Sequence, residues 1–300
     1  MSQQEKELGI QRSISQIVDA KTTTEGDGFI VHRPFPNSEI REFDPFLLLD
    51  EMGPITLSPG DAKGASDHPH RGFETVTYVI KGAFEHKDSQ GNSGKLFSGD
   101  VQWMTAGSGV VHSEMPEKDF AQKGGTLHGF QLWVNLPKKD KMIKPRYQDI
   151  VSKNIPIVKS SDGKVQVKVI AGESMGKHAV IDTKIPIMYL HFTIQPGGKI
   201  IQQIPKNYNA FAYVASGVGL FGLEQRNVNK EQAIFFERDG DEITIATPKD
   251  AMTPLEVILL GGIPINEPVK RYGPFVMNTD EELQQAISDY KNGKMGLIDF

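Results

Sequence analysis

Two short segments in the first half of the chain carry residues that could bind a transition metal. His68 and His70 lie two residues apart, and so do His112 and Glu114. In an extended strand, residues i and i+2 point to the same face, so each pair can direct both side chains to one point. If both predicted strands line one barrel, their inward faces supply three imidazoles and one or two carboxylates.

The spacing alone leaves the identity of the carboxylate open. Glu74 has the same parity as His68 and His70, and it faces the same way if the predicted strand runs on unbroken. Glu114 has the same relation to His112. Both glutamates are therefore candidates at this point.

Three imidazoles and a carboxylate suit Fe(II), Mn, Co, Ni or Cu, and they can also bind Zn. A six-coordinate metal held by four side chains keeps two positions open, which direct binding of a substrate or oxygen requires. The chain has no Cys, which excludes thiolate ligands, disulfides and a cysteine nucleophile. The pattern is thus typical of a catalytic metal site, because structural zinc sites close with four ligands and often use Cys.

The remaining histidines give weaker signals. His86, His178 and His191 are isolated, and we expect each to be a surface or hydrogen-bonded residue. His128 begins the run HGFQLWVNL, whose alternation predicts a buried strand, with a pocket wall as the alternative.

The elements that must position these side chains are predicted to be strands. From Phe29 onward, short apolar or alternating runs recur near every ten residues, separated by Gly, Pro, Asn and Asp. This rhythm predicts an all-β protein built as antiparallel sandwiches or barrels. One short helix is predicted near the C-terminus, where Thr279 and Glu282 form a capping box before an apolar stripe that ends at Tyr290.

A length of 300 residues suits two domains. YVIKG at residues 78–82 can be laid on YVASG at residues 213–217 with an offset of 135, and SGD at residues 98–100 on DGD at residues 239–241 with an offset of 141. These matches suggest a duplication. The offset of 135 carries His68, His70 and Glu74 to Gln203, Pro205 and Asn209, so only the first copy could hold the metal.

The predicted linker is the polar stretch at residues 137–154, where Lys138, Lys139 and Lys141 form a cluster that we expect to be solvated. We therefore predict an N-terminal metal-binding domain over residues 1–140. The second domain, residues 141–300, is predicted to lack metal ligands and to include the C-terminal helix.

The overall composition narrows the class of partner and the location. The formal charge of -5 gives no broad basic field, so we expect no direct binding to nucleic acid. The N-terminus is polar, and no run of about 18 apolar residues could cross a bilayer. We expect no membrane association and a cytoplasmic protein, also nuclear in a eukaryote.

Longer segments resemble a known family. DHPHRGFETVTYVIKG at residues 67–82, followed by GDVQWMTAGSGVVHSEMP at residues 99–116, is similar to the pirin family of the cupin superfamily. Blocks at residues 44–52, 130–137 and 273–279 also resemble pirin blocks in order. The likeness therefore spans nearly the whole chain.

The resemblance implies a bicupin fold of two β-sandwich barrels, with metal in the N-terminal one. It assigns the ligands to His68, His70, His112 and Glu114, which gives Glu74 a supporting or structural role. The general cupin pattern uses the carboxylate after His-x-His and a Pro-x-Gly before the last His. This chain departs from it, with Thr105-Ala106-Gly107 in the latter place, a variation that pirins share.

The resemblance also implies a function. We expect an Fe(II)-dependent dioxygenase, with other divalent transition metals as alternatives, that cleaves quercetin-type flavonols with O2 and releases CO, with Glu114 as the candidate catalytic base. The alternative is a metal-dependent, redox-sensing binding module that serves as cofactor of a transcription regulator or enzyme. The expected partners are a flavonol-like small molecule and O2, and the alternative function adds a protein partner. We expect the protein to be a monomer.

Overall fold

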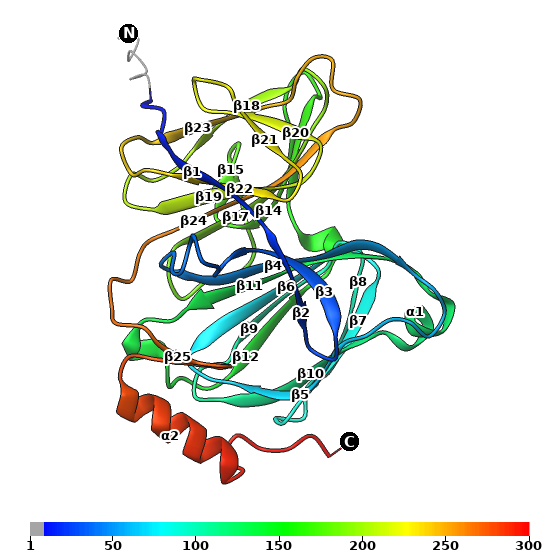
Figure 1. Ribbon diagram of the computed structural model, residues 1–300, viewed down its shortest axis with the longest axis vertical. Coiled ribbons are helices and arrows are strands. Elements are labelled where there is room, and N and C mark those ends of the chain that lie inside the picture. Colours follow the sequence, from blue (N-terminus) through cyan, green and yellow to red (C-terminus); the bar gives the residue numbers. More distant parts are fainter. Residues whose placement is uncertain (1–8, 300) are drawn as a thin grey trace. The chain divides into compact units, whose positions relative to one another are not determined.

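The computed structural model describes residues 9–299, and strands dominate them (Figure 1). The chain divides into two compact units. The first sandwich consists of residues 20–155, residues 180–185 and the segment from Ile265 onward. The second sandwich consists of the described residues up to Asp19, residues 156–179 and residues 186–264. The predicted all-β architecture is confirmed.

The first sandwich contains two antiparallel sheets, of seven strands in the order β12-β9-β6-β11-β4-β3-β2 and of four strands in the order β5-β10-β7-β8. Figure 1 shows β5 and β10 on one side of it, across from β6, β9 and β11. Its elements are β2 (Lys21–Glu25), β3 (Phe29–Phe35), β4 (Phe46–Leu57), β5 (Ala65–His70), β6 (Phe73–Lys81), β7 (Ala83–Asp88), β8 (Ser93–Phe97), β9 (Val101–Thr105), β10 (Val110–Pro116), α1 (Lys118–Lys123), β11 (Gly125–Asn135), the 3-10 turns η1 (Lys138–Asp140) and η2 (Ser152–Asn154), β12 (Arg146–Ile150), β25 (Lys270–Tyr272), β26 (Phe275–Met277) and α2 (Asp280–Lys291).

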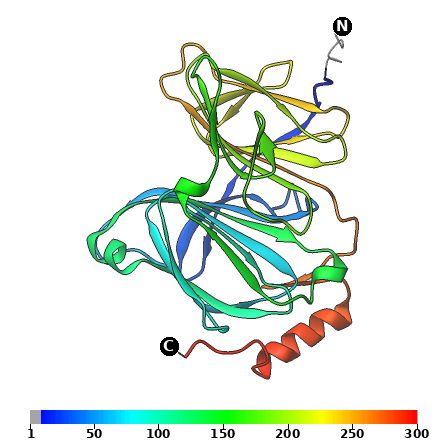
Figure 2. The same cartoon turned by 180° about the vertical axis from the view of Figure 1, so that it is seen from behind.

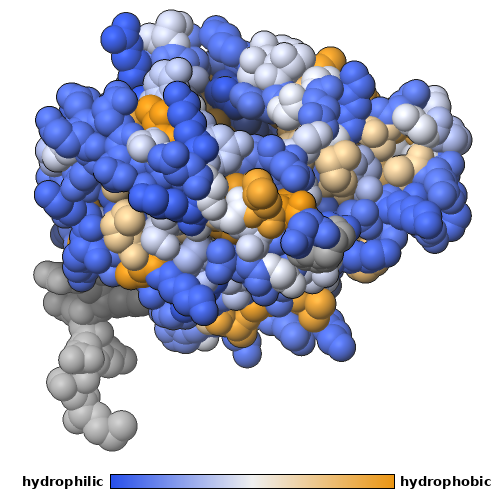
Figure 3. Space-filling view, turned by 90° about the horizontal axis from the view of Figure 1, so that it is seen from below, coloured by the Kyte–Doolittle hydropathy of each residue, from blue (hydrophilic) through white to orange (hydrophobic). Residues whose placement is uncertain are grey.

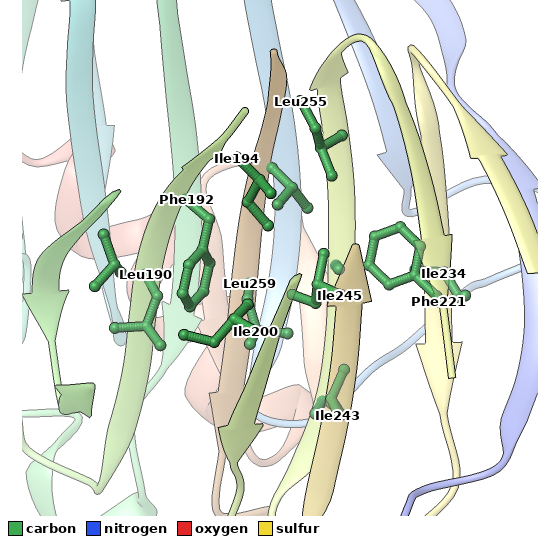
Figure 4. Close-up of a cluster of buried hydrophobic side chains, with 14 of the residues drawn as sticks. Leu190, Phe192, Ile194, Ile200, Phe221, Ile234, Ile243, Ile245, Leu255 and Leu259 are labelled. Carbon is green, nitrogen blue, oxygen red and sulfur yellow. The ribbon is translucent and has the colours of Figure 1, made fainter. Parts of the chain in front are cut away.

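The second sandwich repeats this plan, with sheets ordered β1-β22-β19-β24-β17-β14-β13 and β18-β23-β20-β21. Its interior is filled by aliphatic and aromatic side chains, among them Phe192, Ile200, Phe221, Ile243 and Ile245 (Figure 4). Its strands are β1 (Ile14–Asp19), β13 (Ile157–Lys159), β14 (Val165–Ala171), β15 (Glu173–Ser174), β16 (Lys177–His178), β17 (Ile187–Ile194), β18 (Lys199–Gln203), β19 (Asn209–Ser216), β20 (Val218–Phe221), β21 (Arg226–Asn229), β22 (Gln232–Phe236), β23 (Glu242–Ala246) and β24 (Leu255–Gly262).

The two sheet orders show which part of the sequence duplication is structural. β6 is flanked by β9 and β11, and β19 by β22 and β24, so residues 78–82 and 213–217 occupy equivalent strand ends. The second match fails, because residues 98–100 precede β9 whereas residues 239–241 precede β23, the equivalent of β10.

The predicted C-terminal helix is present, but it lies in the first sandwich. α2 begins with the expected capping box, in which Thr279 and Glu282 each accept a backbone hydrogen bond of the other. Its buried Leu283 and Ala286 pack in one cluster with Val111 of β10. Figure 2 shows α1 and α2 at opposite ends of the first sandwich.

The predicted division at residue 140 therefore assigns both ends of the chain to the wrong sandwich. β1 pairs with β22 in the second sandwich, from Ile14 opposite Phe236 to Asp19 opposite Gln232. The segment from Ile265 onward, and β12, complete the first sandwich. The pairing of β1 with β22 joins residues more than 200 positions apart, and local sequence patterns do not specify it.

Lys141 is not part of a solvated linker. Only 1% of its surface is exposed. Its ammonium donates to the carbonyl oxygens of Gly72 and Val276, at 2.7 and 3.0 Å, and to Oδ1 of Asn135, at 2.6 Å. Burial lowers the pKa of this ammonium to about 8. This residue therefore connects three segments of the first sandwich.

Within residues 9–299, no helix is both long enough and apolar enough to span a bilayer.

Candidate metal centre

Three histidines meet inside the first sandwich. β5 and β10 are antiparallel neighbours, and His68 lies directly opposite His112. The ring centroid of His68 lies 4.4 Å from that of His112 and 4.7 Å from that of His70. One ring nitrogen from each residue lies within 4.8 Å of the others. A cluster this compact could hold one metal ion, which imidazole nitrogens bind at about 2 Å.

The backbone fixes the tautomer of His68. Its Nδ1 lies 2.8 Å from the carbonyl oxygen of Ser66. A carbonyl can only accept, so Nδ1 carries the proton and Nε2 keeps a lone pair for a metal. Hydrogen bonds of this kind are typical of metal-binding histidines, since they hold the ring in place.

His70 and His112 are buried, with 2% and 0% of their surface exposed. Nδ1 of His70 and both ring nitrogens of His112 have no hydrogen-bond partner among the described residues. Burial lowers the pKa of both imidazoles well below the usual value, and the neighbouring histidines lower it further. Neutral imidazoles that keep an unpartnered ring nitrogen in a buried cluster are the donor set that a divalent transition metal requires.

Glu114 lies beside this cluster and its carboxylate is held on two sides. Oε1 lies 2.8 Å from the hydroxyl of Thr77, and Oε2 accepts from Nε2 of Gln131 at 3.2 Å. Oε2 is also 4.0 Å from Nε2 of His112. These contacts hold the carboxylate beside the histidine cluster.

Glu74 does not share the face of His68 and His70, because the strand that was expected to continue from these histidines to Glu74 is interrupted. β5 ends at His70, and Gly72 adopts a φ of +88° before β6 begins. A Cβ at Gly72 would lie 2.0 Å from the carbonyl oxygen of Val276, so the turn requires glycine. Glu74 is buried and accepts from Thr105 at 2.6 Å, and burial raises the pKa of its carboxyl.

A cavity of about 600 Å³ opens beside His68, His70 and Glu114. Its walls combine apolar side chains with Thr77, Gln131 and several charged groups; the lining includes Phe29, Leu48, Met52, Phe84 and Trp133, together with Glu25, Arg33, Asp50 and Arg271. A space of this size takes a ligand of two or three rings.

The charged part of this lining was not predicted. Arg33 donates to both carboxylate oxygens of Asp50, at 2.7 and 2.6 Å, and also contacts Glu25. These three residues come from β3, β4 and β2, and only the register between strands brings them together. Gln131 and Trp133 could have been found, because they share a parity on the predicted strand that begins at His128.

The other isolated histidines lie outside the triad. His128 is buried on β11 and its Nε2 lies 2.8 Å from Oε1 of Glu51, which agrees with the predicted buried strand. His191 lies 2.8 Å from Glu256, and His178 is exposed beside Glu173. His86 is buried and stacks on Tyr147.

The second sandwich has no equivalent cluster, since His68, His70 and His112 form the only such group of His, Cys, Asp and Glu in the described part of the chain. Gln203 ends β18, the equivalent of β5, and the apolar side chains of Figure 4 fill the space.

Comparison with known proteins places both halves of the chain in one family. Residues 28–134 match the Pirin family, and residues 189–296 match the Pirin C-terminal cupin domain. A pirin-like protein of Solanum lycopersicum is 46% identical over 285 residues, which cover 95% of this chain and 93% of the relative. Pirin of Homo sapiens is 40% identical over 293 residues, 96% of each chain.

Among solved structures, a quercetin 2,3-dioxygenase from Acinetobacter baumannii superimposes with a TM-score of 0.90 at 34% identity. The match covers 97% of this chain and all of that one. The likeness therefore includes both sandwiches and the N- and C-terminal segments that complete them.

Proposed function

Because the chain belongs to the pirin family of cupin proteins, we propose that it is an Fe(II)-dependent dioxygenase that cleaves quercetin-type flavonols. The observation that supports this most is the compact cluster of three imidazoles, two of which, His68 and His70, line a cavity of about 600 Å³. The similarity to a quercetin 2,3-dioxygenase agrees with it. The proposed ligands are His68, His70, His112 and Glu114.

In this proposal the protein binds and orients a flavonol inside the cavity. Trp133, Phe84 and Met52 provide apolar walls for a planar ring system, which they also shield from water. When bound, iron supplies the Lewis acidity that favours the deprotonated 3-hydroxyl and the redox chemistry that oxygen requires.

Glu114 is the proposed catalytic base. Its carboxylate removes the proton of the substrate 3-hydroxyl, and the contacts from Thr77 and Gln131 keep it facing the cavity. The overall reaction balances: one flavonol and one O2 give one ester of a phenolic acid and one CO. The ring carbon that carried the 3-hydroxyl leaves as CO, and both atoms of O2 remain in the ester.

The alternative is a metal-dependent, redox-sensing binding module that serves as cofactor of a transcription regulator or an enzyme. It would use the same metal site, but it makes no use of the cavity beside the histidines, and so the cavity favours the enzyme. On the face drawn in Figure 3, hydrophobic side chains form small separate areas in a mainly hydrophilic surface. Broad apolar patches, which mark many protein interfaces, are not seen there.

The experiment loads the protein with Fe(II) under anaerobic conditions, adds quercetin and oxygen, and follows oxygen uptake together with CO release. We expect both signals in the wild type, their loss with the iron in His68→Ala, and iron retained with turnover at least 100-fold slower in Glu114→Gln. His178→Ala removes an exposed histidine and serves as the matched control.

Bound iron without oxygen uptake in the wild type would reject the dioxygenase and favour the binding module. Full activity in Glu114→Gln would reject the role of Glu114 alone.

A further inference from the structure

The cavity beside the histidines contains two arginines, and only one of them is neutralised. Arg33 is paired with Asp50 and Glu25. Arg271 forms no ion pair with any carboxylate in the described part of the chain. Its guanidinium makes one hydrogen bond with the described residues, from Nη1 to the carbonyl oxygen of Leu47 at 3.3 Å. Four of its five N–H groups are therefore left for another acceptor.

Arg271 is placed against the aromatic wall of the cavity. Its Cζ lies 4.7 Å from the ring centroid of Trp133, in a cation-π contact. The same indole lies 5.2 Å from the ring of His70, edge to face. The indole of Trp133 therefore contacts both the guanidinium of Arg271 and the histidine cluster.

The electrostatic surroundings of Arg271 favour an anion. Burial lowers the pKa of this guanidinium, and the positive charge of Arg33 lowers it further, while Glu25 and Asp50 act in the opposite direction. Those two carboxylates are already engaged by Arg33. A bound anion would relieve the repulsion between the two arginines, and a planar guanidinium binds carboxylate and phenolate oxygens through two parallel hydrogen bonds.

The walls restrict the shape of that anion. Trp133, Leu48 and Met52 line the cavity together with the rings of Phe29 and Phe84. Such surfaces suit a flat aromatic body, whereas inorganic anions would leave most of this apolar area uncovered.

We propose that Arg271 and Trp133 form an anion-binding subsite, which selects planar aromatic ligands with an ionised acidic oxygen at the end away from the histidines. The inference rests on the proposed function only in taking the histidine cluster as the anchor for the opposite end of the ligand. It assigns to Arg271 the role of a specificity-determining residue.

The test compares two probes that differ in one group. 6-Hydroxy-2-naphthoate and 2-naphthol share the fused rings and the hydroxyl, and only the first carries a carboxylate. Their dissociation constants are measured by calorimetry on the Fe(II)-loaded full chain without oxygen. We expect the naphthoate to bind about tenfold more tightly to the wild type, as a charge-assisted hydrogen bond allows.

Arg271→Gln should bring the two dissociation constants within about twofold of each other, and Arg271→Lys should keep part of the preference. The matched control is Lys270→Gln, which removes the same charge one residue away, where Lys270 pairs with Asp280. This control should keep the tenfold preference. The Arg271 side chain is only partly covered and makes a single hydrogen bond among the described residues, so its replacement should leave thermal unfolding unchanged.

Equal weakening of both probes by Arg271→Gln, an unchanged preference in that variant, or failure of both probes to bind the wild type would overturn the subsite. Quercetin turnover is scored separately. If quercetin is not turned over, but the wild type prefers the naphthoate and Arg271→Gln loses that preference, the dioxygenase is rejected and the subsite is retained.

Discussion

Thr77 and Gln131 decide where the Glu114 carboxylate points. The Thr77 hydroxyl lies 2.8 Å from Oε1 of Glu114 and 2.7 Å from Oε1 of Gln131, and its single proton can serve one of them at a time. A carboxylate held by neighbours binds a metal with less loss of side-chain freedom. Residues that orient metal ligands in this way commonly contribute 10- to 100-fold to affinity.

We predict that Thr77→Val, which keeps the shape and removes the hydroxyl, weakens iron binding about tenfold. Competition with a chelator of known affinity measures this. Thr75→Val is the control, since Thr75 is equally buried on the same face of β6. Wild-type affinity in Thr77→Val would show that the hydroxyl does not position Glu114.

Asp50 predicts a pH dependence of stability. Burial raises the pKa of this carboxyl to about 6, and Arg33 offsets only part of that effect. Glu25 also raises the pKa, and Arg271 lowers it. Between pH 4 and 6 the folded protein therefore holds a proton that the unfolded chain has lost, and so the free energy of unfolding falls as pH rises through this range.

The expected fall is at most about 3 kcal/mol, and Asp50→Asn should remove it. Urea unfolding at several pH values from 4 to 7 measures the difference between the two proteins. The exposed Asp61 provides the control Asp61→Asn, which should retain the wild-type slope. A wild-type slope in Asp50→Asn would place the responsible group elsewhere.

At the residue scale, the sequence predicted that three histidines would lie together, but it did not predict the charged residues of the cavity wall. Strand parity identified His68, His70 and His112, because residues two apart on a strand share a face wherever that strand lies. The contact of Arg33 with Asp50, and of Arg271 with Trp133, depends on which strands become neighbours. Local spacing contains no information about that choice.

At the scale of elements, Lys141 stabilises the junction of three parts of the first sandwich. These are the turn between β5 and β6, strand β26, and the segment that follows β11. The Lys141 ammonium donates to three acceptors that have lost contact with water. Lys141→Met fills the same space and removes this donor. Oδ1 of Asn135 still accepts from the backbone N–H of Leu136, whereas the carbonyls of Gly72 and Val276 lose a buried partner, at a cost of about 1–3 kcal/mol for each group in general.

We predict that Lys141→Met lowers the free energy of unfolding by about 3 kcal/mol at pH 7, measured by urea unfolding. Lys139→Met replaces an exposed lysine two residues away and should change it by less than about 0.5 kcal/mol. Equal stability of the two variants would mean that water takes over the acceptors of Lys141.

The sequence placed Lys141 in a polar run and so predicted a solvated residue. Its burial follows from the return of the C-terminal segment, whose Val276 supplies one of the acceptors. The helix of that segment was predicted correctly, because its capping box and apolar stripe are local signals. Its location in the first sandwich was not predicted, because an apolar stripe does not specify the element against which the helix packs.

At the scale of the whole molecule, each sandwich is completed by a segment from the far end of the chain. β1 provides the edge strand beside β22, and its Val18 is buried. β12, β25, β26 and α2 complete the first sandwich. A cut after residue 140 therefore leaves each fragment without strands that its own sandwich requires.

We predict that fragments 1–140 and 141–300 do not unfold cooperatively when separate, but together form a 1:1 complex that binds Fe(II). Each fragment then supplies the segment that the other lacks, and the contacts within each sandwich are restored. Size-exclusion chromatography, near-UV circular dichroism and iron binding measure the outcome. Ending the second fragment at residue 264 removes β25, β26 and α2, and this shorter partner should fail to restore the iron site. Cooperative unfolding and wild-type iron affinity in fragment 1–140 alone would show instead that the exchanged segments add no stability. The division predicted at residue 140 would then describe an independent domain.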